Sequence, residues 1–183
     1  MGEPWAMVTV SGLPGSGTTT ACSLLHDMLG WEHVNAGALF RQLAAGRGLT
    51  LAELGRRAEI DGSIDRELDA LMVATARARG HVILEGRLTG WMALRHGLPA
   101  LRCWLSAPVH VRAARVGQRD GQDQDTAAAA VLAREASERR RYLAYHGIDY
   151  GDLSIYALVV DTSQCAPAEV AGRIAARLRE DGR

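Results

Sequence analysis

A glycine-rich segment near the start of the chain has the composition of a phosphate-binding loop. Glycine tolerates the left-handed backbone conformations that turn successive N–H groups inward, and such a nest binds anions, most naturally a phosphate. The segment consists of Gly12, Leu13, Pro14, Gly15, Ser16, Gly17, Thr18, Thr19 and Thr20. A helical pattern follows directly, and its N-terminus adds a dipole and unpaired N–H groups. We therefore expect these residues to hold the phosphates of a nucleotide.

The segment fits the P-loop pattern G-x-x-x-x-G-K-[ST] at every position except one. Thr18 stands where the pattern has lysine, and Thr19 occupies the position whose hydroxyl binds Mg²⁺. The chain contains no lysine, because all 21 of its basic residues are arginine. Every mechanism that needs a lysine is therefore excluded. Phosphate binding is still expected, because most of the cradle is backbone.

Short apolar runs alternate with helical patterns along the chain. Apolar runs predict strands at 6–11, 31–35, 81–84, 101–105 and 157–161. Apolar periodicity predicts helices at 18–29, 39–45, 51–60, 64–79, 109–119, 126–145 and 167–179, with a loop at 121–125. This alternation predicts an α/β fold, a three-layer sandwich with a five-stranded parallel sheet. Ligands of such sheets bind beyond the carboxyl ends of the strands.

Composition narrows the function classes. The chain has 183 residues, which suggests one domain, and 21 basic residues balance 21 acidic ones. That balance argues against nucleic-acid binding, and no apolar run is long enough to span a membrane. The N-terminal residues show no signal-peptide pattern, and the three scattered cysteines argue against a disulfide framework or a zinc site. We expect a cytoplasmic monomer.

The chain resembles the nucleoside monophosphate kinases, and within them the short archaeal and actinobacterial cytidylate kinases. The resemblance runs from residue 8 to about residue 163 through GLPGSGTTT, NAGALFRQLA, IDRELD, LEGRLTGWMA, RxxxERRRY and HGIDYGDLSIYALVVDTS. It implies one P-loop kinase domain over 1–183, with a core at about 5–35, 81–118 and 146–183. It also implies a monophosphate-binding insert at about 36–80 and a lid with its exit helix at about 119–145.

The resemblance implies phosphoryl transfer from MgATP to CMP or dCMP. Arg41 and Arg87 would then hold the acceptor phosphate. Bacterial members have a serine at the position of Ala36 that contacts the nucleotide, and Asn35 beside it would make that contact here. Glu85 would hold Mg²⁺ through a water, and its extra methylene relative to the family's aspartate suits that contact. The alternatives are a solvated helix arginine at position 41 and a local Glu85–Arg87 pair.

Two sets of arginines have helical spacing that places each set on one face. Arg112, Arg115 and Arg119 form the first set. Arg134, Glu138 and Arg141 form the second, which resembles the cytidylate kinase pattern Arg-x3-Asp-x2-Arg. By resemblance Glu138 would contact substrate, and the catalytic residues would be Thr18, Arg115, Arg119, Arg134 and Arg141. An exposed Arg134–Glu138 ion pair of little energetic value is the alternative.

Asp65 and Arg66 open the helix before the third predicted strand. By resemblance this part of the insert lies near the acceptor base, and a carboxylate–arginine pair suits the amine and ring acceptors of cytosine. The alternative is that Asp65 and Asp69 only stabilise a helix N-terminus. Two other functions also stay open. One is a P-loop kinase for a different small acceptor, and the other is a nucleotide-binding module without turnover, which the missing lysine favours.

Overall fold

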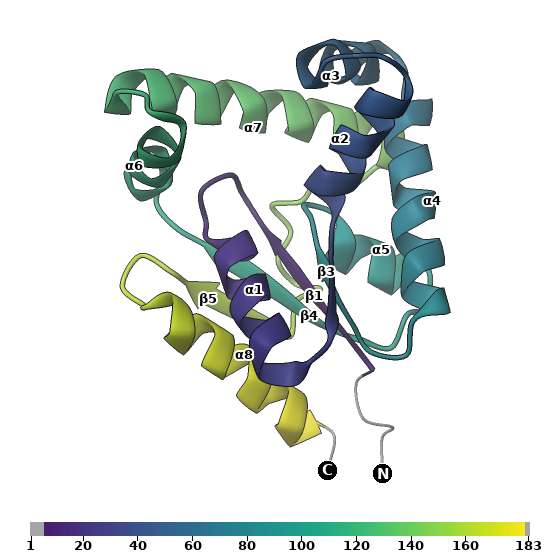
Figure 1. The fold of residues 1–183 in the computed structure, drawn as a ribbon, viewed down its shortest axis with the longest axis vertical. Helices are drawn as coiled ribbons and strands as arrows, with labels where there is room; N and C mark the ends of the chain where they lie inside the picture. The colour runs from purple at the N-terminus through teal and green to yellow at the C-terminus, as the bar shows by residue number, and fades with distance from the viewer. Residues whose placement is uncertain (1–5, 182–183) are drawn as a thin grey trace.

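A computed structural model describes residues 6–181 and shows a single parallel β-sheet (Figure 1). The strands are β1 (Met7–Gly12), β2 (Glu32–Asn35), β3 (Val82–Glu85), β4 (Ala100–Ser106) and β5 (Leu158–Asp161). They are hydrogen-bonded in the order β2-β3-β1-β4-β5, and every neighbouring pair is parallel. The predicted five-stranded parallel sheet is therefore confirmed, and all its carboxyl ends lie along one edge.

The helices alternate with these strands. They are α1 (Thr18–Leu29), α2 (Ala36–Gly46), α3 (Leu51–Ile60), α4 (Ser63–Ala78), α5 (Thr89–Arg95), α6 (Val109–Asp120), α7 (Gln124–His146) and α8 (Pro167–Asp181). None of the helices in the described part of the chain combines the length and the apolarity that a membrane span needs. The α/β sandwich expected from the sequence is the observed architecture.

Two apolar layers cover the sheet, and both faces of its central strands are therefore buried. On one face, Val8, Val10 and Ile83 pack against α1 and α8 through residues such as Leu25 and Ile174. The residues that alternate with these along the strands point to the other face. They include Met7, Val82 and Leu84, and they pack there against α4 and α5. Side chains alternate between the two faces of a strand, so the fully apolar strands seen in the sequence have a physical explanation.

Helices α2, α3 and α4 make up the predicted insert at 36–80 and have a small core of their own. Ala44, Leu54, Ala58 and Ile64 are buried together there. Thr50 starts α3 with a reciprocal capping box to Glu53. Figure 1 shows α2 and α3 rising above the carboxyl edge of the sheet while α4 continues down one face. The insert therefore stands beside the edge at which ligands are expected.

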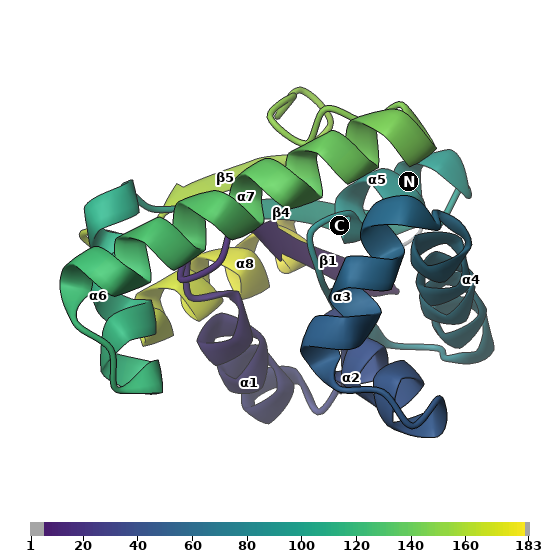
Figure 2. The same ribbon diagram turned by 90° about the horizontal axis from the view of Figure 1, so that it is seen from above.

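Helices α6 and α7 form a hairpin above the same edge (Figure 2). Only residues 121–123 separate them, Gly121 closes α6 in the left-handed conformation, and the Asp123 side chain caps α7. Beneath α7, the return from 147 to 157 buries Ile148, Tyr150 and Tyr156 against Trp104. The segment predicted as a lid with its exit helix, at about 119–145, is the tip of this hairpin together with most of α7.

Two helices begin earlier than the sequence predicts, and one helix was not predicted. Helix α2 begins at Ala36 instead of 39, because Asn35 caps it by accepting a hydrogen bond from the Ala38 N–H at 2.8 Å. Helix α7 begins at Gln124 instead of 126. Helix α5 was not predicted, since its seven residues are too few to show an apolar period.

Candidate active site

The glycine loop joins the end of β1 to the start of α1 and has the backbone that its sequence predicts. Gly15 and Gly17 have φ angles of 82° and 89°, which side-chain-bearing residues rarely adopt. Gly12 needs its small size for another reason, since a Cβ there would lie 2.6 Å from the Leu105 carbonyl oxygen. The glycines therefore serve both the curl of the loop and its close packing on β4.

Two arginines of α6 hold the loop by its carbonyl groups. Arg112 is 2% exposed, and it donates to the Pro14 carbonyl at 3.3 Å and to the Glu135 carboxylate at 3.0 Å. Arg115 donates to the Gly15 carbonyl at 3.3 Å. A planar trans peptide whose carbonyl faces α6 has its N–H on the opposite side. These contacts therefore help to direct the N–H groups of the glycine loop away from α6.

Glu85, at the carboxyl end of β3, is the centre of a hydrogen-bond cluster beside the loop. Its Oε1 accepts from the Thr18 hydroxyl at 2.8 Å and from the Thr19 hydroxyl at 2.6 Å. Its Oε2 lies 2.9 Å from His33 Nε2 and also accepts from the Asn35 amide. Burial raises the pKa of the Glu85 carboxyl, but the four hydrogen bonds outweigh it and hold the pKa below its usual value. The group is thus a buried carboxylate.

The register of the sheet explains why these groups meet. Asn35 on β2 lies directly opposite Glu85 on β3, and His33 lies two residues earlier on the same face of β2. Thr18 and Thr19 form the first turn of α1, which packs on that face. His33 was not among the residues predicted for the site. Its spacing of two from Asn35 in a predicted strand was the available signal.

A second cluster joins the segment after β3 to α7. Arg87 donates to the Gly12 carbonyl at 3.0 Å and to Glu138 at 2.8 Å. Arg134 reaches the other oxygen of Glu138 at 2.9 Å. Burial raises the pKa of Glu138, and the two guanidinium groups outweigh that effect and lower it. The local Glu85–Arg87 pair is therefore not formed, and Glu138 bridges two arginines assigned to the site.

A third group lies between α4 and α7. Arg141 Nε is 3.3 Å from Asp65 Oδ2, and the two side chains are 13% and 6% exposed. Burial, and secondly Asp65, raises the pKa of neighbouring Asp69 to about 7. Asp69 Oδ2 lies 3.5 Å from His146 Nδ1. A cavity of about 40 Å³ opens here, lined by Asp65, Asp69, Arg87 and Tyr142 among others.

Other predicted residues lie apart from these clusters. Arg66 is exposed and does not pair with Asp65, because neighbouring residues of a helix point in different directions. Arg119 is 67% exposed and pairs with adjacent Asp120. Thr20 is exposed, and Arg41 extends from α2 with no hydrogen bond or ion pair to any residue in 6–181. Arg41 is thus a charged side chain available at the carboxyl edge.

The residues around Thr19 fit a magnesium ion. Mg²⁺ prefers oxygen ligands and keeps several waters. The Thr19 hydroxyl and the Glu85 carboxylate supply oxygen atoms 2.6 Å apart, next to the anion nest of the loop. The lowered pKa of Glu85 keeps this donor ionised. The donor set therefore matches a hard divalent cation held partly through water.

Three features together define the P-loop kinase class. They are a glycine nest beyond β1, two threonine hydroxyls that follow it, and a buried carboxylate on the adjacent strand. Solved structures share the fold. A shikimate kinase from Acinetobacter baumannii in complex with shikimate has a TM-score of 0.63 at 17% identity, covering 98% of this chain and 94% of that chain. A protein from Eubacterium ventriosum has a TM-score of 0.73 at 15% identity, covering 97% and 99%.

Sequence comparison gives the family. The model of the Cytidylate kinase-like family matches residues 7–164. A cytidylate kinase from Pyrococcus furiosus is 47% identical over 161 residues, which are 88% of this chain and 82% of that protein. One from Methanocaldococcus jannaschii is 44% identical over 159 residues, 86% and 89% of the two chains. The chain belongs to the Cytidylate kinase-like family and is a nucleoside monophosphate kinase.

Proposed function

We propose that the protein transfers the γ-phosphoryl group of ATP to CMP or dCMP and releases ADP and CDP or dCDP. The observation that carries this proposal is the Glu85 cluster, which joins the loop threonines to the acceptor-side strands β2 and β3. An oxygen of the acceptor phosphate attacks the γ-phosphorus, and the bond to the β–γ bridging oxygen breaks. The acceptor oxygen is already ionised, so no general base is needed.

On the donor side, residues 12–20 hold the ATP phosphates through backbone N–H groups. Thr19 and, through water, Glu85 hold Mg²⁺, which supplies positive charge to the phosphates when it is bound. Thr18 cannot replace the charge of a lysine. Arg115 lies beside the loop, with Nη1 3.8 Å from the place of a Cβ on Gly17. We assign to Arg115 the positive charge that the loop itself lacks.

On the acceptor side, Arg41 and Arg87 hold the acceptor phosphate, because guanidinium forks donate two parallel hydrogen bonds to phosphate oxygens. Glu138 positions Arg87 through their 2.8 Å hydrogen bond. Arg134 and Arg119, which are largely exposed, approach the phosphates when the α6–α7 hairpin closes as a lid.

The cavity beside Arg87 is the proposed site of the acceptor base. Asp65 reads the exocyclic amine of cytosine, since a carboxylate accepts from an N–H donor. Arg141 lies 3.3 Å from Asp65 and forms with it the carboxylate–arginine pair that was expected of Asp65 and Arg66. Asn35 joins the acceptor side to Glu85 through its amide.

Product analysis tests this function. The protein is incubated with MgATP and a panel of nucleoside monophosphates, and diphosphates are separated and quantified. Formation of CDP or dCDP in preference to other diphosphates supports the proposal. A diphosphate from another acceptor alone contradicts the substrate assignment. ATP binding without product from any acceptor supports the second candidate, a nucleotide-binding module, which the presence of Thr18 in place of lysine favours.

A further inference from the structure

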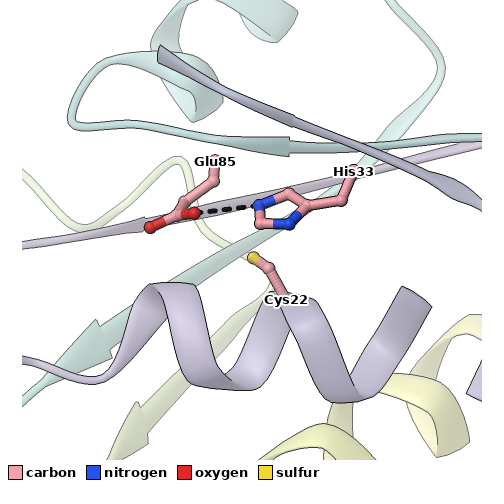
Figure 3. A group of neighbouring side chains, drawn as sticks. All are labelled: Cys22, His33 and Glu85. Atoms are coloured by element: carbon pink, nitrogen blue, oxygen red, sulfur yellow. Dashed lines mark hydrogen bonds and ion pairs between the residues drawn. The ribbon is translucent and has the colours of Figure 1, made fainter. Parts of the chain in front are cut away.

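Three side chains of metal-binding type meet between α1 and the sheet (Figure 3). Cys22, His33 and Glu85 each offer one ligand atom, and these atoms lie within 4.8 Å of one another. Cys22 is fully buried, and the side chains of His33 and Glu85 are 19% and 7% exposed. In Figure 3 the thiol, the imidazole and the carboxylate all project into the same space.

The fold assembles this group from three separate elements. Cys22 lies one helical turn after Thr18 and Thr19 on α1, so it faces the same strands as those threonines. His33 and Glu85 come from adjacent strands of the sheet. A search for closely spaced ligands in the sequence cannot find such a set, because its members are brought together only by the packing of α1 on β2 and β3.

The ligand types select the kind of cation. Thiolate, imidazole and carboxylate together are a donor set of Zn²⁺, whereas Mg²⁺ and Ca²⁺ prefer oxygen ligands alone. Zinc bonds to these atoms are about 2.0–2.3 Å long, so a small rotation of the side chains is enough to close the set around one ion. Three protein ligands leave one tetrahedral position for a water.

Metal binding at this cluster requires the Cys22 thiol to lose its proton. Burial, and then the charge of Glu85, raises the pKa of the Cys22 thiol well above its usual value, so the thiol is neutral without a metal. A divalent cation compensates a buried thiolate and a buried carboxylate together, and its binding releases the thiol proton to solvent. His33 then coordinates through Nε2 with its own proton on Nδ1, and its contact with Glu85 is replaced by bonds to the ion.

We propose that Cys22, His33 and Glu85 form a binding site for one thiophilic divalent cation of the Zn²⁺ type, and that its occupation inhibits the enzyme. Inhibition follows because the cation engages the carboxylate that the Thr18 and Thr19 hydroxyls otherwise share. The inhibition rests on the proposed function, whereas the binding site does not.

Cobalt binding tests the site without any assay of activity. The full chain is freed of metal with a chelator and titrated with Co²⁺, whose thiolate complexes have a charge-transfer absorption and whose tetrahedral complexes have intense visible bands. We expect both signals to saturate at one equivalent and to disappear when Zn²⁺ is added. The absence of a thiolate signal in the folded protein would overturn the proposal.

Variants identify the ligands. Cys22→Ala should abolish the thiolate band, and His33→Gln should weaken cobalt affinity by on the order of tenfold or more while preserving an amide donor to Glu85. Cys165→Ser and His96→Gln are the matched controls, and both should bind as the original chain does. Loss of the band in Cys165→Ser, or its persistence in Cys22→Ala, would refute the assignment. Circular dichroism checks that each variant is folded.

Zinc titration of the kinase reaction tests the regulatory part. At saturating MgATP, Zn²⁺ should inhibit the original chain more strongly than Cys22→Ala, each measured relative to its own activity without zinc. Equal inhibition of the two proteins would refute inhibition through this site. Cobalt binding by a protein that makes no diphosphate would sustain the site and reject the proposed function, so the two failures are distinguishable.

Discussion

The donor half and the acceptor half of the site are stabilised differently. In the donor half, defined as residues 12–20 with Glu85 and its partners, arginines donate to backbone carbonyls, and hydroxyl, amide and imidazole groups surround the carboxylate. In the acceptor half, defined as the pairs of Glu138 and Asp65 with arginines, each buried carboxylate has a guanidinium partner.

This difference has a physical consequence for each half. Backbone geometry is fixed by glycine conformation and hydrogen bonds, so the donor half keeps its shape when a side chain loses its charge. The acceptor half depends on charge balance, because an unpaired buried charge costs several kcal/mol. Changes of charge should therefore affect activity in the donor half and folding stability in the acceptor half.

The largest effect is expected for Arg87→Met in the acceptor half. The substitution leaves Glu138 buried with only the exposed Arg134 as a partner, and removal of one member of a buried pair costs about 3–5 kcal/mol. Urea unfolding measures the free energy. Arg134→Met, which removes the 61% exposed partner of the same carboxylate, should cost less than about 1 kcal/mol. Equal losses would show that burial does not distinguish the two arginines.

Glu85→Gln should have its main effect on the rate. The amide keeps one accepting oxygen in place of two and lacks the charge that suits Mg²⁺, so kcat should fall by on the order of a hundredfold to a thousandfold. The KM for CMP should change less than kcat, since Arg41 and the arginine pairs of Glu138 and Asp65 are intact. Steady-state kinetics with Glu32→Gln, an exposed carboxylate of β2, provide the control. A large loss of stability with an unchanged kcat would reverse the contrast between the halves.

Asp69, a neighbour of the Asp65–Arg141 pair, should make the stability of the fold sensitive to pH. Its folded-state pKa of about 7 lies above the usual 3.8, so its protonated form stabilises the fold fully below about pH 4, and this contribution is lost as the pH rises through 7. Relative to Asp69→Asn, the original chain should lose about 4 kcal/mol from pH 4 to pH 8.

Urea unfolding of the two proteins across this range measures the difference. Asp65, Arg95, His146 and Arg141, the charged or titratable groups around Asp69, are retained in the variant, so their contributions are common to both proteins. A difference that does not vary with pH would contradict a raised pKa.

The smallest effect is expected for Thr18→Lys. Because Arg115 already places positive charge beside the loop, and because a lysine at this position would also meet Glu85, the rate should change by less than about tenfold. Single-turnover kinetics measure the chemical step. A rise of about a thousandfold or more would show that no arginine compensates for the missing lysine.

Local features of the fold were predictable. The strand, the glycine loop and the helix that follow one another over 7–29 depend on apolar runs and on glycine conformations that each segment specifies by itself. Family resemblance added the candidate residues, and the comparisons confirm the family. Helix α5 was the exception, because its identity as a helix depends on packing against β1 and β4 and not on its own periodicity.

The sequence by itself determined the parallel α/β fold, the phosphate nest and the absence of lysine from it, since these follow from composition and neighbouring residues. Helical spacing predicts the Arg134–Glu138 pair, but only the tertiary structure decided which charges are paired between different elements. Arg87 meets Glu138 instead of Glu85, and Arg141 instead of Arg66 meets Asp65. It also decided that Cys22 and His33 flank Glu85. Pairing across 51 residues, as in Arg87–Glu138, depends on how the sheet and helices pack, and no local pattern encodes it.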